Sequence, residues 1–436
     1  MPAGWVVAKL DFNNAFNTLR PDRMLLSVSD SIPEILPFCQ LAYQDPSVLA
    51  YGSRSILSCE GVQQGDPLGP LLFSLTLHPI LLSMKSPVKF GYLDDVTAAG
   101  PELTVEEDVK QLNQSSNDIG LTLNVTKCEL IIADGRRCSL PIIGSFIHVD
   151  PEKATLLGAP LLTGSCMDKA LNGHCENLSR AVGRLKLISA HDALTIIRHS
   201  LSAPKLNYML RASPSAGHSS LVIFDDIQRK ALCTIINVDF TDSQWAQASL
   251  PVGLGGLGVR SVSSLAPSAF LASAAGTRIL QDLLLTKVSQ ADMADAEVSR
   301  IEKLWCNLSK STMPSGLAAH MQRNWDGVIT SRQYKEIVES STGNNLARIL
   351  AVSAPHSGEW LNAIPISSCG LRLSNDAIRV AVGLRVGARL CEPHKCVCGA
   401  EVEALGTHGL NCKSGSRRVA RHNFLNDIIW RALNKC

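Results

Sequence analysis

The sequence lacks the uninterrupted apolar run of about 20 residues that a membrane-spanning helix requires. Its longest apolar stretch, Leu68 to Met84, is shorter and contains Gly69, Pro70, His78 and Pro79. We therefore expect a buried helix in this stretch and no membrane partner. An N-terminal signal peptide is also missing, which favours the nucleus or the cytoplasm as the location.

The first part of the chain is short of positive charge. Residues 1–160 carry 11 Lys and Arg against 18 Asp and Glu, a net charge of −7, whereas the whole chain has a net charge of +2. Residues 161–384 carry 21 basic against 17 acidic residues, and residues 385–436 carry 9 against 4. Basic surfaces bind nucleic-acid backbones. The later part of the chain is therefore the part that we expect to bind a nucleic acid.

Composition predicts a folded protein of several domains. The chain has 436 residues, of which 45% are hydrophobic and 18% are charged, a balance typical of two to four globular domains. Its 14 cysteines occur without a signal peptide, so we interpret them as reduced thiols, most of them small buried hydrophobic side chains.

Three acidic residues stand next to short apolar runs. Asp94 and Asp95 lie between two such runs, a pattern typical of a β-hairpin with the acids at its tip. Adjacent strand residues point to opposite faces, so such a pair usually commits one carboxylate to a given site. A nucleotide-polymerising site needs a second acid, and Asp11 follows another apolar run. For an isolated Asp-Asp pair, a solvated turn is the commoner explanation.

Four motifs occur in a fixed order. They are D-x-x-x-A-F from Asp11, Q-G-D-P-L-G-P from Gln64, Y-L-D-D from Tyr92 and G-L-x-L-N-x-x-K from Gly120. Each string alone is weak, but together they resemble the reverse transcriptase of non-LTR (LINE-like) retrotransposons over residues 1 to about 160. The resemblance implies an RNA-directed DNA polymerase whose partners are an RNA template, a DNA primer and dNTPs.

The resemblance also implies a set of metal ligands. Asp11, the backbone carbonyl of Phe12 and Asp94 would bind two Mg²⁺ (or Mn²⁺) ions, which prefer oxygen ligands. Asp95 is the third catalytic candidate, placed at the edge of the metal sphere or supporting the hairpin. Asp66, within the second motif, is left out of the metal set.

Other positions match residues that contact the nucleotide. Phe16 matches an aromatic position that excludes the ribose 2′-OH, and Gln64 and Gly65 match residues next to the incoming dNTP, as Phe12 does. Lys127 matches a lysine near the phosphates. Without the motifs, Phe16 would be a plain core aromatic residue and Lys127 a surface charge.

The expected architecture is α+β. We predict a palm with a split βαβ sheet in residues 1–162, a helical thumb in 163–265 and a helical extension in 266–385. A zinc knuckle would follow in 386–415 and a basic helix in 416–436. Gly253 to Gly258 match the glycine spacing of a dinucleotide-binding loop, but no strand precedes them, so we interpret them as a turn.

Basic residues recur among apolar ones from about residue 180 to 205, including Arg198, and again after residue 416. The first series resembles a thumb that grips the template and primer through their backbones, although such a series is also typical of a solvated helix face. The residues that we assign to nucleic-acid binding are Arg180, Arg184, Lys186, Arg417, Arg418 and Arg421.

A Cys/His pattern stands near the C-terminus. Cys396, Cys398, His408 and Cys412 form C-x-C-x9-H-x3-C, a closed ligand set that suits structural Zn²⁺. It resembles the zinc knuckle that follows the polymerase in non-LTR elements. Two alternatives remain: free cysteines without a metal, or a set in which Cys391 replaces one ligand.

The family has parts that this sequence does not hold. A basic fingers region would precede the motif at Asp11, and in some elements an endonuclease would follow the knuckle. We therefore expect a fragment. The alternative to a polymerase is a catalytically dead remnant that binds nucleic acid through its thumb and knuckle. The sequence does not indicate an oligomeric state.

Overall fold

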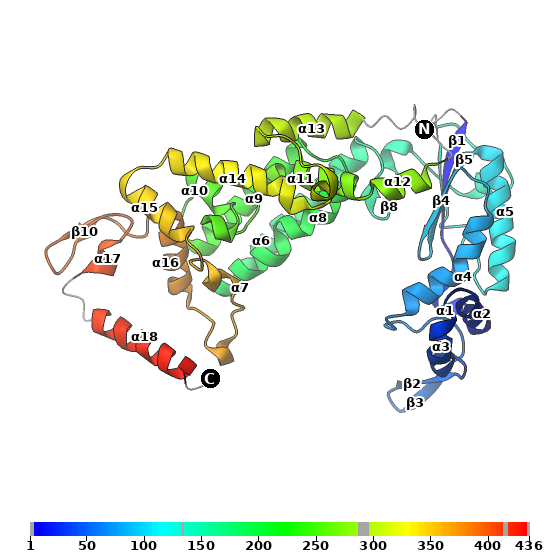
Figure 1. The fold of residues 1–436 in the computed structure, drawn as a ribbon, viewed down its shortest axis with the longest axis horizontal. Coiled ribbons are helices and arrows are strands. Elements are labelled where there is room, and N and C mark those ends of the chain that lie inside the picture. Colours follow the sequence, from blue (N-terminus) through cyan, green and yellow to red (C-terminus); the bar gives the residue numbers. More distant parts are fainter. Residues whose placement is uncertain (1–3, 133–134, 287–295, 413–416, 434–436) are drawn as a thin grey trace. The chain divides into compact units, whose positions relative to one another are not determined.

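The protein is described by a computed structural model (Figure 1). The residues described are 4–132, 135–286, 296–412 and 417–433. They form two units, residues 1–168 with 274–297 and residues 169–273 with 298–436, here called unit 1 and unit 2. Each unit is described by itself.

Unit 1 contains a five-stranded sheet in the order β4-β5-β1-β6-β7. The strands are β1 (Trp5–Leu10), β4 (Val88–Tyr92), β5 (Asp95–Pro101), β6 (Glu129–Ile132) and β7 (Ile147–Val149). Neighbouring strands are antiparallel except for the parallel pair β6 and β7. Helices α4 (Gly69–Ser83) and α5 (Glu102–Asp118) contact each other and run beside the sheet (Figure 1). The sequence β1-α4-β4-β5-α5-β6 gives the predicted split βαβ arrangement.

The remaining elements of unit 1 are short. They are α1 (Ala15–Thr18), α2 (Pro21–Ser31), α3 (Leu36–Tyr43), β2 (Ser47–Tyr51), β3 (Arg54–Ser58), β8 (Thr155–Leu156), β9 (Ala159–Pro160) and α12 (Arg278–Leu284). The mixed α+β class expected from the sequence is confirmed, including the sheet.

Alternation along β1 decides which side chains reach the core. Val6, Ala8 and Leu10 are buried, whereas the residues between them are only partly buried. Since side chains alternate between the faces of a strand, the buried set faces the helices, and Lys9 and Asp11 belong to the other face. The long apolar run forms helix α4 as predicted, with Leu72 and Phe73 fully buried.

Unit 2 is helical apart from a small hairpin. Its elements are α6 (Ser165–Leu185), α7 (Ala190–Ile196), α8 (Ala203–Ala212), α9 (Ser219–Ile236), α10 (Asp242–Ala248), α11 (Val262–Gly276), α13 (Ala296–Ser309), α14 (Gln322–Glu339), α15 (Gly343–Val352), α16 (Asn375–Val386), β10 (His394–Lys395), β11 (Glu401–Val402), α17 (His408–Asn411) and α18 (Arg417–Leu433). Some of these helices begin or end across a unit boundary. One predicted domain boundary, 265/266, falls inside α11. The division into thumb and extension stays a prediction.

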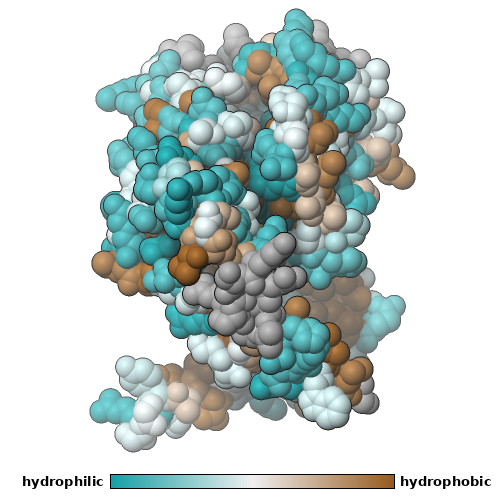
Figure 2. All heavy atoms as spheres, turned by 90° about the vertical axis from the view of Figure 1, so that its left-hand side faces the viewer, coloured by the Kyte–Doolittle hydropathy of each residue, from teal (hydrophilic) through white to brown (hydrophobic). Residues whose placement is uncertain are grey.

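No helix among the described residues is long and apolar enough to cross a membrane. On the face drawn in Figure 2, hydrophilic residues cover most of the surface, and hydrophobic residues form small separate groups. Helix α4, the most apolar stretch of the sequence, packs into the core of unit 1.

The glycine-rich segment in unit 2 is a turn, as interpreted from the sequence. It begins with a short 3₁₀ helix, Val252–Leu254, and its carbonyl groups accept hydrogen bonds from two buried arginines. Arg198 donates to the carbonyl of Leu257 (2.6 Å), and Arg385 donates to the carbonyls of Val252 (2.7 Å) and Gly256 (3.0 Å). Burial lowers the pKa of both guanidinium groups, that of Arg385 to about 10.

The position of Arg198 corrects an expectation. The sequence places Arg198 in a basic series that resembles a thumb or forms a solvated helix face, but only 7% of it is exposed. It lies in the π-helical turn Ile197–Leu201 that follows α7, and its donors satisfy backbone carbonyls. Arg198 is therefore a structural residue.

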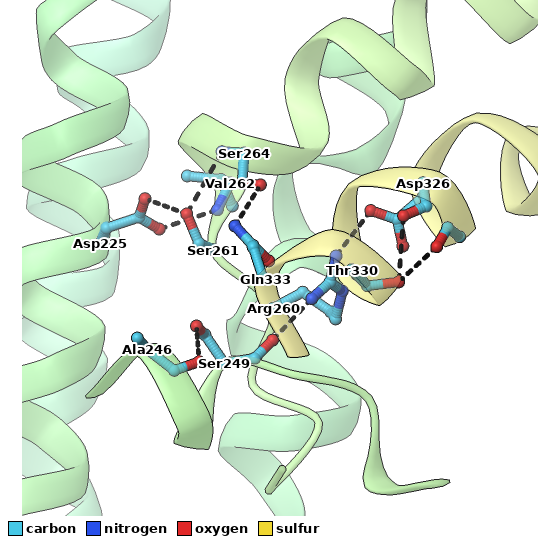
Figure 3. Close-up of polar contacts among 11 residues, drawn as sticks. Asp225, Ala246, Ser249, Arg260, Ser261, Val262, Ser264, Asp326, Thr330 and Gln333 are labelled. Atoms are coloured by element: carbon cyan, nitrogen blue, oxygen red, sulfur yellow. Dashed lines mark hydrogen bonds and ion pairs between the residues drawn. The ribbon is translucent and has the colours of Figure 1, made fainter. Parts of the chain in front are cut away.

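A buried carboxylate fixes the start of α11. Asp225 on α9 accepts hydrogen bonds from the hydroxyl of Ser261 (2.7 Å) and from the backbone amide of Val262 (2.8 Å) (Figure 3). It also accepts one from the backbone amide of Ser263 (3.1 Å). Helix N-termini leave backbone amides without partners inside the helix, and Asp225 supplies the acceptor from a neighbouring helix. Burial raises the pKa of this carboxyl, and the hydrogen bonds oppose the rise.

We predict that Asp225→Ala destabilises the protein by about 3 kcal/mol, because two buried amides and a hydroxyl lose their acceptor. The free energy of unfolding, measured with urea, checks this. The matched control is Asp226→Ala, which changes the exposed neighbour on the same helix. A loss of less than about 1 kcal/mol in the Asp225 variant, or an equal loss in both, contradicts the assignment.

Candidate active site and metal cluster

The backbone of Asp11 is held by the fourth motif of the sequence. The carbonyl of Asp11 accepts a hydrogen bond from the amide of Asn124 (2.8 Å), and the amide of Asn13 donates to the carbonyl of Thr122 (2.9 Å). Neither bond uses the carbonyl of Phe12, which is the proposed metal-binding oxygen. Two motifs more than a hundred residues apart are thus joined at the end of β1.

The Y-L-D-D motif forms the predicted hairpin. Tyr92, the last residue of β4, pairs with Asp95, the first residue of β5, and Leu93 and Asp94 make the turn. Leu93 has a φ of 59°, a left-handed conformation that is strained for a residue with a side chain. In the pairing of β1 with β5, Leu10 lies opposite Val96. Asp11 directly follows Leu10, Asp95 directly precedes Val96, and the charges of Asp11 and Asp94 both act on Asp95, so the structure brings the three predicted acids near one another.

The three carboxylates act on one another electrostatically. Burial raises the pKa of Asp95, and the charges of Asp94 and Asp11 raise it further. Lys9 opposes this rise, but its ammonium group is also paired with Glu129 on β6. The cluster therefore keeps an excess of negative charge that a cation would neutralise.

Asp11 shows why a cation fits. In the described part of the chain, its Oδ1 atom is buried without a hydrogen-bond partner. A buried carboxylate oxygen without a partner costs free energy unless a positive charge compensates it. The donor set is made only of oxygens, which is the set that Mg²⁺ and Mn²⁺ prefer. The residues present thus fit the divalent cations that the motifs imply.

The predicted nucleotide-contacting residues gather around α1. Phe16 is half-buried, and its ring stacks on that of Phe73 with the centroids 4.5 Å apart. The amide of Val62 donates to the carbonyl of Phe16 (2.6 Å), which brings the Q-G-D-P turn next to this helix. Gln64 and Gly65 are exposed in that turn, and the side-chain amide of Gln64 lies 3.5 Å from Oδ1 of Asn17.

Two residues at the site were missed by the sequence analysis. Gly61 has a φ of 80°, and a Cβ atom there would lie 2.5 Å from Cα of Asn17, so only glycine allows the turn to approach α1. Cys128 is buried behind Asp11, whose amide lies 3.4 Å from its sulfur. A glycine just before the motif was the available signal for Gly61. The sequence held no signal for Cys128.

Asp66 lies in the turn of the second motif and Lys127 lies on the surface next to Cys128. Asp66 accepts hydrogen bonds from the hydroxyl of Tyr43 and from the amide of Leu68 (2.9 Å), so it stabilises the turn. Lys127 is exposed, one residue before Cys128. Its side chain makes no ion pair with the acids in the described part of the chain.

Four further predicted ligands lie together in unit 2. The ligand atoms of Cys396, Cys398, His408 and Cys412 are all within 4.8 Å of one another. The sulfur atoms of Cys396 and Cys412 are 3.7 Å apart, and Nε2 of His408 is 3.3 Å from the sulfur of Cys398. Hydrogen bonds from the backbone of Cys398, the larger contribution, and from the side chain of His408 lower the pKa of the Cys396 thiol to about 6.

Cys391 is not part of this cluster. Its thiol lies 3.4 Å from the carbonyl of Glu403, to which it donates. The arrangement therefore favours the set with His408 over the alternative in which Cys391 replaces one ligand. Three cysteine sulfurs and one imidazole nitrogen at these distances form a donor set that suits Zn²⁺.

The predicted nucleic-acid contacts are only partly described. Arg180 and Arg184 are exposed one helical turn apart on α6, and Lys186 is exposed directly after it. Arg417, Arg418 and Arg421 belong to α18, but their side chains lie outside the described residues.

Comparisons with known proteins agree with the motifs and the geometry. Residues 1–161 match the family "Reverse transcriptase (RNA-dependent DNA polymerase)". The chain is also 22% identical over 391 residues to the retrotransposable element SLACS 132 kDa protein of Trypanosoma brucei gambiense. This match covers 87% of the chain and 28% of that protein, so the chain spans less than a third of its relative.

Residues 1–161 are thus a reverse transcriptase domain, the class of polymerase that copies RNA into DNA. The order of motifs in this domain and the retrotransposon relative are both similar to what non-LTR reverse transcriptases have. The alternative, a catalytically dead remnant, is not favoured by these findings.

We predict that Asp95 contributes stability to the metal-free protein near the ordinary Asp value of 3.8 that is lost at higher pH, and that Asp95→Asn removes this contribution. The raised pKa of Asp95 means that its protonated form favours the folded state, so this stabilisation is lost as the pH rises through the folded-state value. The measurement is the melting temperature of both proteins from about pH 4 to about pH 7 in EDTA. Asp30→Asn, at an exposed acid, is the control. Parallel pH curves for wild type and the Asp95 variant would refute the prediction.

Proposed function

We propose that this chain transfers a deoxynucleotidyl group from a dNTP to the 3′-OH of a DNA primer, directed by an RNA template. The observation that carries the proposal is the convergence of Asp11, Asp94 and Asp95 at the end of β1, with one oxygen of Asp11 buried and unpaired. The match of residues 1–161 to reverse transcriptases supports it.

Asp11, the carbonyl of Phe12 and Asp94 would hold two Mg²⁺ or Mn²⁺ ions. When bound, such ions lower the pKa of the primer hydroxyl and stabilise the charge of the leaving pyrophosphate. Asp95 supports the hairpin and adds to the negative charge of the cluster. The backbone bonds of Asp11 to Asn124, and of Asn13 to Thr122, fix the strand end before substrate binds, which reduces reorganisation during the reaction.

The residues around α1 would form the nucleotide side of the site. Phe16 is supported by its stacking on Phe73, which would hold the ring rigidly against a ribose 2′-OH. A hydroxyl buried against this ring would lose its hydrogen bonds to water, at a cost of about 1–3 kcal/mol. Gln64 and Gly65 stand exposed beside α1 and would contact the dNTP, and Lys127 would lie near its phosphates.

The later part of the chain would bind the template and primer. Arg180, Arg184 and Lys186 are exposed on the predicted thumb, where their charges can reach a nucleic-acid backbone. Arg417, Arg418 and Arg421 would add contacts after the knuckle. The Cys396, Cys398, His408 and Cys412 cluster would bind one structural Zn²⁺, because this short segment buries few apolar side chains of its own.

We predict that Asp94→Asn lowers primer extension by at least about 100-fold, the order of loss caused by removing one group that stabilises transition-state charge. The assay measures incorporation of dNTPs on an RNA template with Mg²⁺ by the purified chain. The control, Asp30→Asn, removes an equal charge at an exposed position on α2. Equal extension by wild type and the Asp94 variant would reject the proposed function.

We predict that the purified chain holds one equivalent of zinc and that Cys396→Ser removes most of it. Cys391→Ser should keep the metal, because that thiol bonds to a backbone carbonyl outside the cluster. Metal analysis of the three proteins by mass spectrometry tests both statements. Zinc below about half an equivalent in wild type, or its loss in the Cys391 variant, contradicts the assigned ligands.

A further inference from the structure

Unit 2 contains a basic groove that the sequence motifs do not indicate. It has a volume of about 710 Å³ and lies between the end of α13 and one side of α14. Four of its lining side chains are basic, namely Lys310, Arg323, Arg332 and Lys335. None of the described residues that line it is acidic, so the groove has a strong positive charge.

Among the described residues, one of the four basic side chains has an acidic partner. Arg332 is paired with Glu336 (2.6 Å) and donates to the carbonyl of Leu308 at the end of α13 (2.7 Å). In the described part of the chain, no ion pair joins Lys310, Arg323 or Lys335 to a carboxylate. Like charges gathered in a concave surface raise its positive potential and attract anions.

Of the three acids on α14, Glu336 is paired with the groove residue Arg332, and Asp326 is engaged elsewhere. Asp326 is turned toward Arg260, with which it forms an ion pair of 2.6 Å (Figure 3). Gln333 bonds to Ser264, and Trp325 and Ile329 are buried on the same side. The helix thus has one face fixed within unit 2 and another face that presents basic side chains.

The remaining lining suits phosphate and sugar groups. It includes the hydroxyl groups of Ser311 and Ser331 and the amide of Asn324, all of which can donate hydrogen bonds. Val328 is its one large apolar residue among those described, and none of them is aromatic. A surface with cations and hydroxyl groups but without aromatic rings binds a nucleic-acid backbone and does not stack its bases.

The length of the groove favours a chain of phosphates over a single one. Arg323 and Lys335 lie at opposite ends of the exposed face, which at 1.5 Å per helical residue are roughly 18 Å apart. An isolated phosphate cannot contact both ends. We propose that this groove, between α13 and α14, binds the phosphodiester backbone of a nucleic acid without regard to base sequence. The proposal deepens the proposed function and rests on it, since it adds a binding surface for the RNA or DNA partner.

The test measures binding of a labelled single-stranded RNA by the full chain as a function of salt concentration. Arg323→Gln with Lys335→Gln should weaken binding by about tenfold at about 0.1 M salt. The slope of log K against log salt should become shallower by about 1.4, the value for two phosphate contacts on a single strand. Arg323→Lys with Lys335→Arg retains both charges and should bind like wild type.

The control removes two charges elsewhere, with Lys303→Gln and Arg278→Gln, both at exposed positions. It should leave the slope unchanged. Unchanged affinity and slope in the Arg323/Lys335 double variant, or an equal change in the control, would overturn the proposal. Both double variants alter exposed side chains, and their melting temperatures confirm that they fold. If the groove variant melts early, Lys335→Gln alone replaces it, with an expected slope change of about 0.7.

Binding without Mg²⁺ and dNTPs separates this proposal from the polymerase function. Asp94→Asn should keep the wild-type salt slope although it loses primer extension. A groove variant that binds like wild type refutes the groove and leaves the polymerase function intact. Extension by the Asp94 variant at the wild-type level refutes the polymerase function, while the binding data still decide the groove.

Discussion

The mutual repulsion of Asp11, Asp94 and Asp95 is the constraint around which unit 1 is built. Burial raises the pKa of Asp95, and the negative charges of Asp94 and Asp11 raise it further, so the charged cluster is costly to hold at one end of a sheet. The surrounding structure holds them in place through backbone bonds from residues 122–124 and through the pairing of β1 with β5. This is the usual balance at a catalytic site, where geometry needed for the reaction is maintained against the local preference for stability.

Much of unit 1 could be predicted from the sequence because its signals are local. The hairpin at Asp94 and the helix after Gly69 each depend on a few neighbouring residues, and the structure shows both. The approach of Gly61 to Asn17 and the contact of Cys128 with Asp11 were not predictable. Both depend on tertiary packing between segments far apart in the chain, which periodicity does not report.

In unit 2, tertiary packing likewise decided which charged side chains are exposed, and the sequence could not predict it. From the sequence, Arg198 looked like one more member of a basic helical series, but burial and the carbonyl acceptors of a distant turn make it a structural residue. Conversely, the basic residues of α13 and α14 stand among Ala, Leu and polar residues without a motif. Only the fold shows that Asp326 forms an ion pair with Arg260 and that the other face of α14 is positively charged. The charge count of a segment therefore predicted a basic region but not its binding surface.

The glycine-rich turn held by Arg198 and Arg385 has a consequence for synthesis of the protein on the ribosome. The turn and Arg198 are translated well before Arg385, so the carbonyl of Gly256 lacks its arginine donor until α16 is made. Packing of unit 2 can therefore be completed only after α16 has been made. At that stage the strands of the unit 1 sheet have already been translated, whereas the glycine-rich turn of unit 2 still lacks the hydrogen bond from Arg385.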